Sequence, residues 1–163
     1  MEPKILVPLD GSALSERAIE PAEKIAKGIG YEMVLFRVID KPLLESTLEV
    51  EPEQERRAAS ASIEKATTYL KGIASRIEGK GIKTRIEVGV GYPHTAILAL
   101  ADKEDVEFII MSTHGRTGLS RALMGSIAEK VVYTTKRPVM LVKPEKIQET
   151  RTGQEKAILS VRS

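Results

Sequence analysis

Five short apolar runs are spaced along most of the chain. They are bounded by polar or turn residues, and they occupy residues 5–9, 33–39, 83–88, 106–111 and 139–142. Runs of this length between turn residues are typical of buried strands. The run at 106–111 is apolar enough for a strand buried on both faces, whereas the run at 83–88 alternates between apolar and polar positions. The pattern predicts five strands.

Apolar residues recur at helical spacing in the segments that follow the first four runs. The predicted helices cover residues 12–29, 53–78, 92–102 and 126–135. Ser12 can cap the first helix, and Gly28 and Gly30 can end it. Gly79 and Gly81 close the second helix. Strands and helices therefore alternate almost throughout this part of the chain.

Such alternation predicts an α/β fold with a parallel sheet built from right-handed crossovers. The simplest arrangement is a single doubly wound sheet of five strands in the order 3-2-1-4-5, with helices on both faces. The winding then reverses between the first and fourth strands, and ligands bind beyond the carboxyl ends of the strands at that point. Residues 9–12 and 112–115 would meet there, so we expect the functional site between them.

Two segments lack a periodic pattern. Residues 41–52 are interpreted as a mobile loop. Residues 144–163 form a mostly polar tail, for which we favour a poorly ordered terminus over a strand that docks to a partner. A chain of 163 residues is expected to build one core. We therefore predict one domain over residues 1–143, followed by the tail.

The amino-acid composition mainly excludes certain kinds of site and partner. The chain has no cysteine, which excludes disulfides, thiolate metal sites and cysteine nucleophiles, and His94 and His114 alone cannot build a structural zinc site. Lys and Arg total 25 against 23 for Asp and Glu, a balance that favours neither nucleic acid nor an anionic membrane as a partner. No apolar stretch approaches a membrane span, and we expect no signal peptide before the first strand. We expect a cytoplasmic protein.

The loop after the fourth predicted strand carries the candidate chemistry. It reads Ser-Thr-His-Gly-Arg-Thr-Gly-Leu over residues 112–119 and reaches Gly125 and Ser126. A polyphosphate needs backbone N–H groups directed at it, and glycine lets the main chain approach closely. The N-terminus of a helix adds its dipole and free N–H groups, and Gly125 and Ser126 stand at such a start. The loop predicts a phosphate site, to which Arg116 and Arg121 could contribute.

The spacing in this loop resembles the motif of the ATP-binding universal stress proteins. In that family the motif is Gly, two residues, Gly, nine residues, then Gly followed by Ser or Thr. The matching positions are Ser112, Gly115, Gly125 and Ser126. Ser112 departs from the motif, which has glycine there, but serine is small and can donate a hydrogen bond.

Other segments resemble the same family from about Lys4 to Lys143. Residues 5–12, Ile-Leu-Val-Pro-Leu-Asp-Gly-Ser, look like its first strand and loop, and residues 91–94, Gly-Tyr-Pro-His, look like its turn into the third helix. The resemblance implies an adenine nucleotide alpha hydrolase-like fold. It also implies a homodimer that pairs through the final strand, Val139–Val142.

The resemblance further implies how a nucleotide is held. Asp10 would bind the ribose hydroxyls, and the main chain near Val38 and Ile39 would meet the adenine. We therefore expect ATP, together with the Mg²⁺ that it carries, at the point where the winding reverses. The residues expected at this site are Pro8, Leu9, Asp10, Gly11, Ser12, Val38, Met111, Ser112, His114, Gly115, Arg116, Gly125, Ser126 and Ile127.

Some of these residues also have plain structural explanations. Asp10 could cap the first helix, and His114 could be a hydrogen-bonded loop residue without a ligand. Gly118 could serve a turn, and Gly125 could allow close packing of a helix on a strand. Arg116 could simply face water, as most surface charges do.

Other functional classes fit the sequence less well. No Walker P-loop occurs, and the run from Gly89 to Gly91 has His94 where a dinucleotide fingerprint needs its third glycine. A receiver-type phosphoacceptor domain shares this strand order, and both Asp10 and Lys143 suit it. However, the third predicted strand ends in Gly-Val-Gly, with no aspartate to phosphorylate.

The function predicted is that of a nucleotide-dependent stress-response or regulatory module. It would bind ATP without fast turnover, because no general base is evident. The alternative is an interaction module that keeps the fold and has lost the nucleotide. Such members of the family lack the glycine motif that this chain retains.

Overall fold

The computed structural model describes residues 2–40, 52–115 and 124–143. The predictions about Arg116, Gly118, Arg121 and the tail at 144–163 lie outside these residues. So does the loop predicted at 41–52, except for Pro52, which already belongs to a helix.

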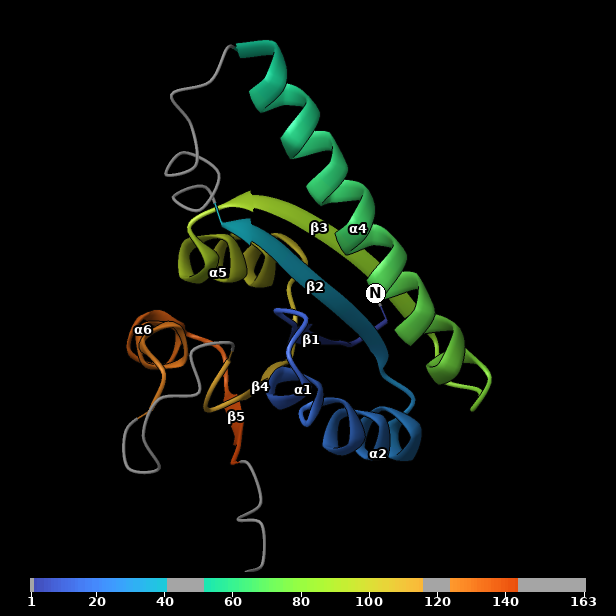
Figure 1. Cartoon of the computed structure of the whole chain (residues 1–163). Helices are drawn as coiled ribbons and strands as arrows, with labels where there is room; N and C mark the ends of the chain where they lie inside the picture. Colours follow the sequence, from blue (N-terminus) through green and yellow to red (C-terminus); the bar gives the residue numbers. More distant parts are fainter. Residues whose placement is uncertain (1, 41–51, 116–123, 144–163) are drawn as a thin grey trace, which may run out of the picture.

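The described residues contain one parallel sheet of five strands. The strands are β1 (Lys4–Pro8), β2 (Glu32–Asp40), β3 (Thr84–Gly91), β4 (Phe108–Ser112) and β5 (Val139–Val142). Their order is β3-β2-β1-β4-β5, and each neighbouring pair is parallel (Figure 1). The predicted fold class is confirmed, including the reversal of winding between β1 and β4.

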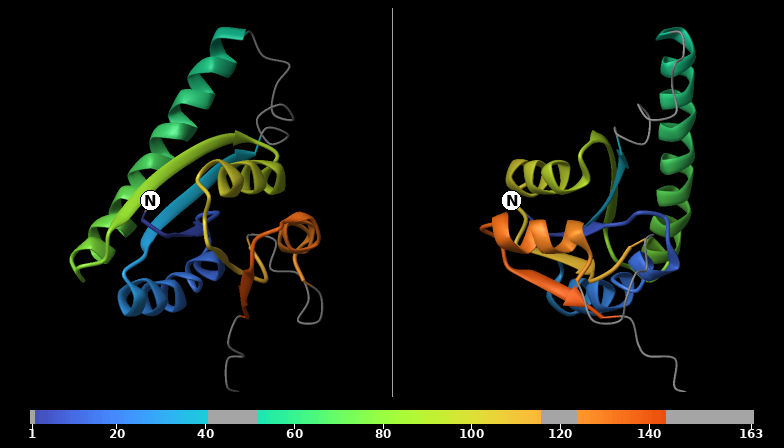
Figure 2. Two further views of the ribbon diagram at one scale, coloured as in Figure 1. Left: turned by 180° about the vertical axis from the view of Figure 1, so that it is seen from behind. Right: turned by 60° about the vertical axis from the view of Figure 1, so that its left-hand side comes forward.

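Helices cover both faces of this sheet. They are α1 (Ala13–Glu16), α2 (Ile19–Ile29), α4 (Pro52–Glu78), α5 (Pro93–Lys103) and α6 (Ser126–Thr134). Figure 2 shows α2 and α4 on one side of the sheet and α5 and α6 on the other. None of the helices in the described ranges is both long and apolar enough to cross a membrane.

Two apolar cores result from the alternation of side chains along the strands. In β1, Ile5 and Val7 face the core under α2 and α4, whereas Leu6 faces the core under α5 and α6. All three side chains are fully buried. Because β1, β2 and β4 each contribute to both cores, the buried stretches of these central strands are apolar without a break, as expected for a parallel sheet covered on both sides.

The helix predicted over residues 12–29 is broken in two, and Pro21 explains the break. Arg17 and Ala18 form a tight turn, in which their N–H groups donate to the carbonyls three residues back, Leu14 and Ser15. A proline inside a continuous helix would lack the N–H and would clash with the carbonyl four residues earlier. The helix therefore starts again at Ile19, where the proline falls in the first turn and is tolerated.

The strand predicted at 83–88 runs further than the sequence indicated. Gly89, Val90 and Gly91 belong to β3, where they pair with the last three residues of β2. A side chain at Gly89 would collide with the ring of Phe36, since an added Cβ would lie 2.9 Å from the ring atom Cζ. The glycine therefore keeps β3 close to β2 and serves no dinucleotide loop.

The fourth strand starts later than the predicted residue 106. Val106 is buried, but its N–H donates to the carbonyl of Ala101 across a turn. Asp105, in the same turn, has a left-handed backbone with a φ of 52°. This turn ends α5 and delays the strand to Phe108.

A cluster of charges ties together the amino-terminal ends of the strands. Glu104, just after α5, receives a hydrogen bond of 2.5 Å from Arg85 Nη2 and one of 3.0 Å from Lys4 Nζ. Its side chain is only 11% exposed. The hydrogen bonds from Arg85 and Lys4 lower the pKa of Glu104 to about 2.

We predict that Glu104→Gln lowers the free energy of unfolding at pH 7 by about 1–2 kcal/mol, because the neutral amide leaves two cations poorly compensated. The pKa in the folded state, about 2, lies below the ordinary value of 4.5. The contribution is therefore complete above pH 4.5 and is lost as the pH falls toward 2. Urea unfolding at several pH values should show parent and variant converging in acid.

Glu64→Gln is the matched control, since Glu64 lies exposed on α4. Its stability should follow that of the parent at every pH. A Glu104→Gln deficit that stays constant down to pH 3 would contradict the assignment.

Candidate functional site

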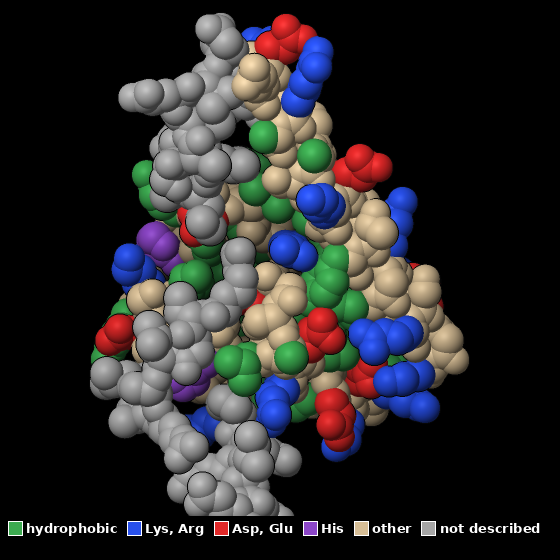
Figure 3. Space-filling model, viewed as in Figure 1, with side chains coloured by type: hydrophobic (Ala, Val, Ile, Leu, Met, Phe, Trp, Pro, Cys, Tyr) green, Lys and Arg blue, Asp and Glu red, His purple; other side chains and the backbone are tan. Residues whose placement is uncertain are grey.

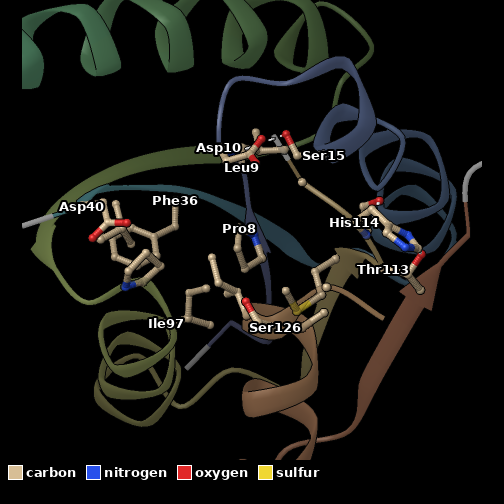
Figure 4. A pocket seen from close by; sticks show the side chains of 18 residues that line it. Pro8, Leu9, Asp10, Ser15, Phe36, Asp40, Ile97, Thr113, His114 and Ser126 are labelled. Atoms are coloured by element: carbon tan, nitrogen blue, oxygen red, sulfur yellow. Dashed lines mark hydrogen bonds between the residues drawn. The ribbon is translucent and has the colours of Figure 1, made fainter. Parts of the chain in front are cut away.

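A pocket of about 380 Å³ opens at the carboxyl ends of the strands, where β1 and β4 separate. It is built from the ends of β1, β2 and β4 and from the first turns of α5 and α6, with Ser15 of α1 beside them (Figure 4). This is the place that the strand order predicted. A volume of this size is typical of a site for a small molecule or cofactor.

Most of the residues predicted for the site line this pocket. They are Pro8, Leu9, Asp10, Val38, Met111, Ser112, His114, Gly115, Gly125, Ser126 and Ile127. Gly11 and Ser12 lie in the adjoining turn without lining the pocket, and Arg116 lies outside the described residues. The structure thus brings together segments that are about 100 residues apart in the chain.

The two ends of the pocket differ in character. Figure 4 shows Phe36, Asp40 and Ile97 at one end and Thr113 and His114 at the other. The first end is apolar except for the carboxylate of Asp40. The second is rich in glycine, hydroxyl groups and backbone amides. Among the described residues, no lysine or arginine lines the pocket.

The turn after β1 is held by short hydrogen bonds. Asp10 Oδ1 accepts from the Ser12 N–H at 2.9 Å and from the Ser12 hydroxyl at 2.6 Å. Ser12 Oγ in turn accepts from the Ser15 N–H at 3.1 Å, so Ser12 is the residue that caps α1. The alternative in which Asp10 caps this helix is therefore wrong. Asp10 instead fixes the turn that precedes the cap.

Arg37 packs against this turn on the face of the sheet that α4 covers. Its guanidinium carbon lies 5.0 Å from the centre of the Tyr69 ring. Gly11 has a φ of +84°, and a Cβ there would lie 2.9 Å from Arg37 Nη1. The backbone conformation at position 11 favours glycine, and the absence of a side chain leaves room for the guanidinium group.

The loop after β4 closes against the turn after β1. A Cβ at Gly115 would overlap Asp10 Oδ2, so only glycine lets the two segments approach this closely. This contact confirms that residues 9–12 and 112–115 meet.

The start of α6 is tied to the end of β4. The Gly125 N–H donates to the carbonyl of Thr113 at 2.8 Å, and a Cβ on Gly125 would lie 3.1 Å from that oxygen. Gly125 is the N-cap of α6 and has no side chain to bond the first-turn N–H groups. These groups face the glycine-rich end of the pocket, where an anion could accept their hydrogen bonds.

His114 lies in the loop after β4, and only one of its two ring nitrogens has a hydrogen-bond partner among the described residues. Its Nδ1 is 3.0 Å from the Thr113 hydroxyl. Its Nε2 is buried and has no hydrogen-bond partner within the described part of the chain. The interpretation of His114 as a hydrogen-bonded loop residue therefore accounts for one ring nitrogen and not for the other.

Several lining residues escaped the sequence prediction. They are Ser15, Phe36, Asp40, Pro93, Ile97 and Ala128. Thr113 also lines the pocket and lies within the predicted segment 112–115. Alternation along β2 could have identified two of them, since Phe36 and Asp40 lie on the same side of the strand as the predicted Val38. Ser15 carried no such signal, because its place is set by hydrogen bonds of its hydroxyl, which accepts from the Asp10 N–H and donates to the Ser12 carbonyl.

A metal site built by the protein alone finds no support in the described ranges. They contain no group of three or more His, Asp or Glu side chains that could hold an ion.

Comparisons with known proteins converge on one family. A model of the universal stress protein family matches residues 1–143. Universal stress protein MJ0577 of Methanocaldococcus jannaschii is 31% identical over 159 residues, which cover 88% of this chain and 96% of that protein. The solved structure of MJ0577 aligns with a TM-score of 0.80 at 32% identity, over 90% of this chain and 99% of the other.

Two other solved structures are similar in fold and contain nucleotides. A universal stress protein in complex with cAMP aligns with a TM-score of 0.64 at 21% identity, over 87% of this chain and 97% of that one. The universal stress protein from Archaeoglobus fulgidus in complex with dAMP aligns with a TM-score of 0.62 at 20% identity, over 88% of this chain and 98% of that one. At this level of identity the likeness shows the fold alone.

We predict that Gly115→Ala lowers the free energy of unfolding by about 1–3 kcal/mol, because the added methyl group must displace Asp10 from its turn. Gly72→Ala is the matched control. Gly72 lies within α4 with nothing within 4 Å of an added Cβ. The control should raise the stability by about 0.5–1 kcal/mol. Denaturant unfolding measures both, and a Gly115→Ala protein as stable as the parent would rule out this close contact.

Proposed function

This chain belongs to the universal stress protein family, and we propose that it is an ATP-binding member that acts in the cytoplasm as a nucleotide-dependent regulatory module. The observation that carries the proposal is the pocket at the switch point. One end of it suits a purine base, and the other suits a chain of phosphates.

The apolar end has the shape and chemistry expected of an adenine slot. Phe36, Val38, Pro93 and Ile97 provide apolar walls. The ribose would then lie beside Asp10, whose carboxylate can accept hydrogen bonds from its hydroxyl groups. The two solved relatives that contain cAMP and dAMP hold adenine nucleotides, and this agrees with a base of the same kind here.

The glycine-rich end suits the phosphates. The first-turn N–H groups of α6, the small side chains of Ser112 and Ser126 and the unpartnered Nε2 of His114 can all face an anion. A helix N-terminus favours negative charge through its dipole. Mg²⁺ carried by ATP would supply further positive charge at this end.

The proposed mode of action is binding rather than rapid hydrolysis. Within the described residues, the carboxylates that line the pocket are Asp10, which we assign to the ribose, and Asp40, which lies at the apolar end. Neither is therefore assigned to activating a water molecule at the phosphates. Occupancy would instead alter the surface formed by the two loops and by α6. The receiver-type alternative is not supported, because β3 ends in Gly89, Val90 and Gly91 and offers no phosphoacceptor.

The direct test is calorimetry with ATP on protein stripped of ligand, together with mass spectrometry of any nucleotide released by heating. Nucleotide that copurifies, or saturable binding of one ATP per chain, is the expected result. Protein that carries none and shows no heat of binding would leave the interaction module without nucleotide as the better description.

For Asp10, we predict that Asp10→Asn weakens ATP binding roughly tenfold to a hundredfold, because a charge-assisted hydrogen bond to the ribose is lost. The amide keeps an acceptor for the Ser12 N–H, so the turn should survive. ADP should lose as much affinity as ATP. Calorimetry with 2′,3′-dideoxy-ATP is the control, since that ligand has no hydroxyl groups to lose. Equal losses with ATP and its dideoxy analogue would refute the ribose assignment.

We also propose a homodimer joined through β5. Within the described residues β5 pairs with β4 alone, and Met140 is 42% exposed. The carbonyls of Pro138 and Val142 accept from β4, so the backbone groups of Val139 and Leu141 point to the free edge of the sheet. Exposed edges are usually covered or paired, and a second copy can do this symmetrically.

We predict that Leu141→Pro converts a dimeric parent to monomer, because it removes an N–H that faces the free edge. Leu141→Ala is the matched control, since it shortens the side chain and keeps the N–H. Sedimentation equilibrium at micromolar concentration measures the mass, and circular dichroism checks the fold. A monomeric parent, or a folded Leu141→Pro dimer, would count against pairing through β5.

A further inference from the structure

Asp40 ends β2 on the side of the strand that builds the pocket. Side chains alternate along a strand, so Asp40 continues the row of Phe36 and Val38 on the α5 face. Phe36 and Val38 belong to the apolar core there. Asp40 is paired with Gly91 of β3 at the last position of the ladder. Phe36 and Val38 thus lie in the core, and Asp40 follows them with its carboxylate at the apolar end of the pocket (Figure 4).

One oxygen of this carboxylate has no hydrogen-bond donor. Asp40 Oδ1 is buried and has no partner within the described part of the chain. Phe36, Pro93 and Ile97 surround this end and have no side-chain donors. Buried acceptors in native proteins are nearly always paired, and an unpaired one calls for an explanation. A ligand that brings its own N–H to this end would satisfy the oxygen.

We propose that Asp40 accepts a hydrogen bond from the exocyclic amino group of adenine and makes the site selective for 6-aminopurines. The assignment rests on the proposed function, since it assumes a purine in the apolar slot. The amino group at position 6 is the only N–H₂ of adenine. Guanine and hypoxanthine carry a keto oxygen at that position, which would set an acceptor against the carboxylate.

Asp10 and Asp40 then have different tasks. Asp10 lies at the end of β1, against Gly115 of the loop that closes the phosphate end. Asp40 lies two strand residues beyond Val38, at the opposite, apolar end. A nucleotide with its phosphates near the start of α6 would bring its ribose to Asp10 and the far edge of its base to Asp40.

The test is a two-by-two comparison by calorimetry on the full chain. The ligands are ATP and purine riboside triphosphate, which differs from ATP only by a hydrogen in place of the amino group. The proteins are the parent and Asp40→Ala. The parent should bind ATP roughly tenfold to a hundredfold more tightly than the analogue. Asp40→Ala should lose most of this preference by weakening ATP, while its affinity for the analogue stays within about threefold of the parent value.

Asp102→Ala is the matched control protein. It removes the same carboxylate from the exposed surface of α5, away from the pocket, and should keep the full preference of the parent. Asp40→Asn serves if Asp40→Ala does not fold. Its amide can turn an N–H₂ toward a keto oxygen, so ITP should gain affinity relative to ATP.

Three results would overturn the proposal. The first is a parent that binds ATP and the analogue equally, and the second is a folded Asp40 variant that keeps the preference of the parent. In both cases ATP still binds, so the result would refute the role of Asp40 and leave the proposed function unaffected. The third is a parent that binds neither ligand, which removes the proposed function and this inference together.

Discussion

The close approach of two loops, one after β1 and one after β4, is the constraint on which the pocket depends. The two strands are neighbours, but their helices leave to opposite faces of the sheet, α2 to one and α6 to the other. That divergence opens the crevice. Its walls are then set by two close contacts, in which a Cβ on Gly115 would overlap Asp10 Oδ2 and a Cβ on Gly125 would lie 3.1 Å from the Thr113 carbonyl oxygen. A bulkier residue at either position would push apart the groups that a ligand must meet together.

The strand β2 shows how one sequence pattern serves both stability and the site. Its even-numbered residues pass from the core at Val34, through Phe36 and Val38, to the carboxylate of Asp40. Its odd-numbered residues do the same on the other face, from Leu35 in the core to Arg37 behind the turn at Gly11. The same alternation that builds the two cores therefore aims functional side chains at the end of the strand. The contribution of β2 to the pocket therefore comes from the strand itself.

The sequence pattern was sufficient for the fold, because runs of period two and period 3.6 in alternation leave few topologies for a chain of this size. It also located the pocket, since a parallel sheet places its ligands where the winding reverses. It was insufficient where one residue overrides the pattern, as Pro21 does in dividing the first helix. It was also insufficient for side chains whose place depends on three-dimensional contacts. Ser15 lies at the pocket through hydrogen bonds with Asp10 and Ser12, and Gly89 lies in β3 where the ring of Phe36 fills the space of a side chain.

Carboxylates at the two ends of the sheet differ in their hydrogen bonding. At the amino-terminal end, Glu104 is bound by Arg85 and Lys4, and its low pKa records how well the charge is compensated. At the carboxyl-terminal end, Asp40 Oδ1 is buried without a donor among the described residues. An uncompensated buried acceptor lowers stability, and residues that break the rules of packing are concentrated at functional sites. The charge cluster at one end stabilises a sheet that can hold an unsatisfied group at the other, where the proposed ligand would complete the hydrogen bonding.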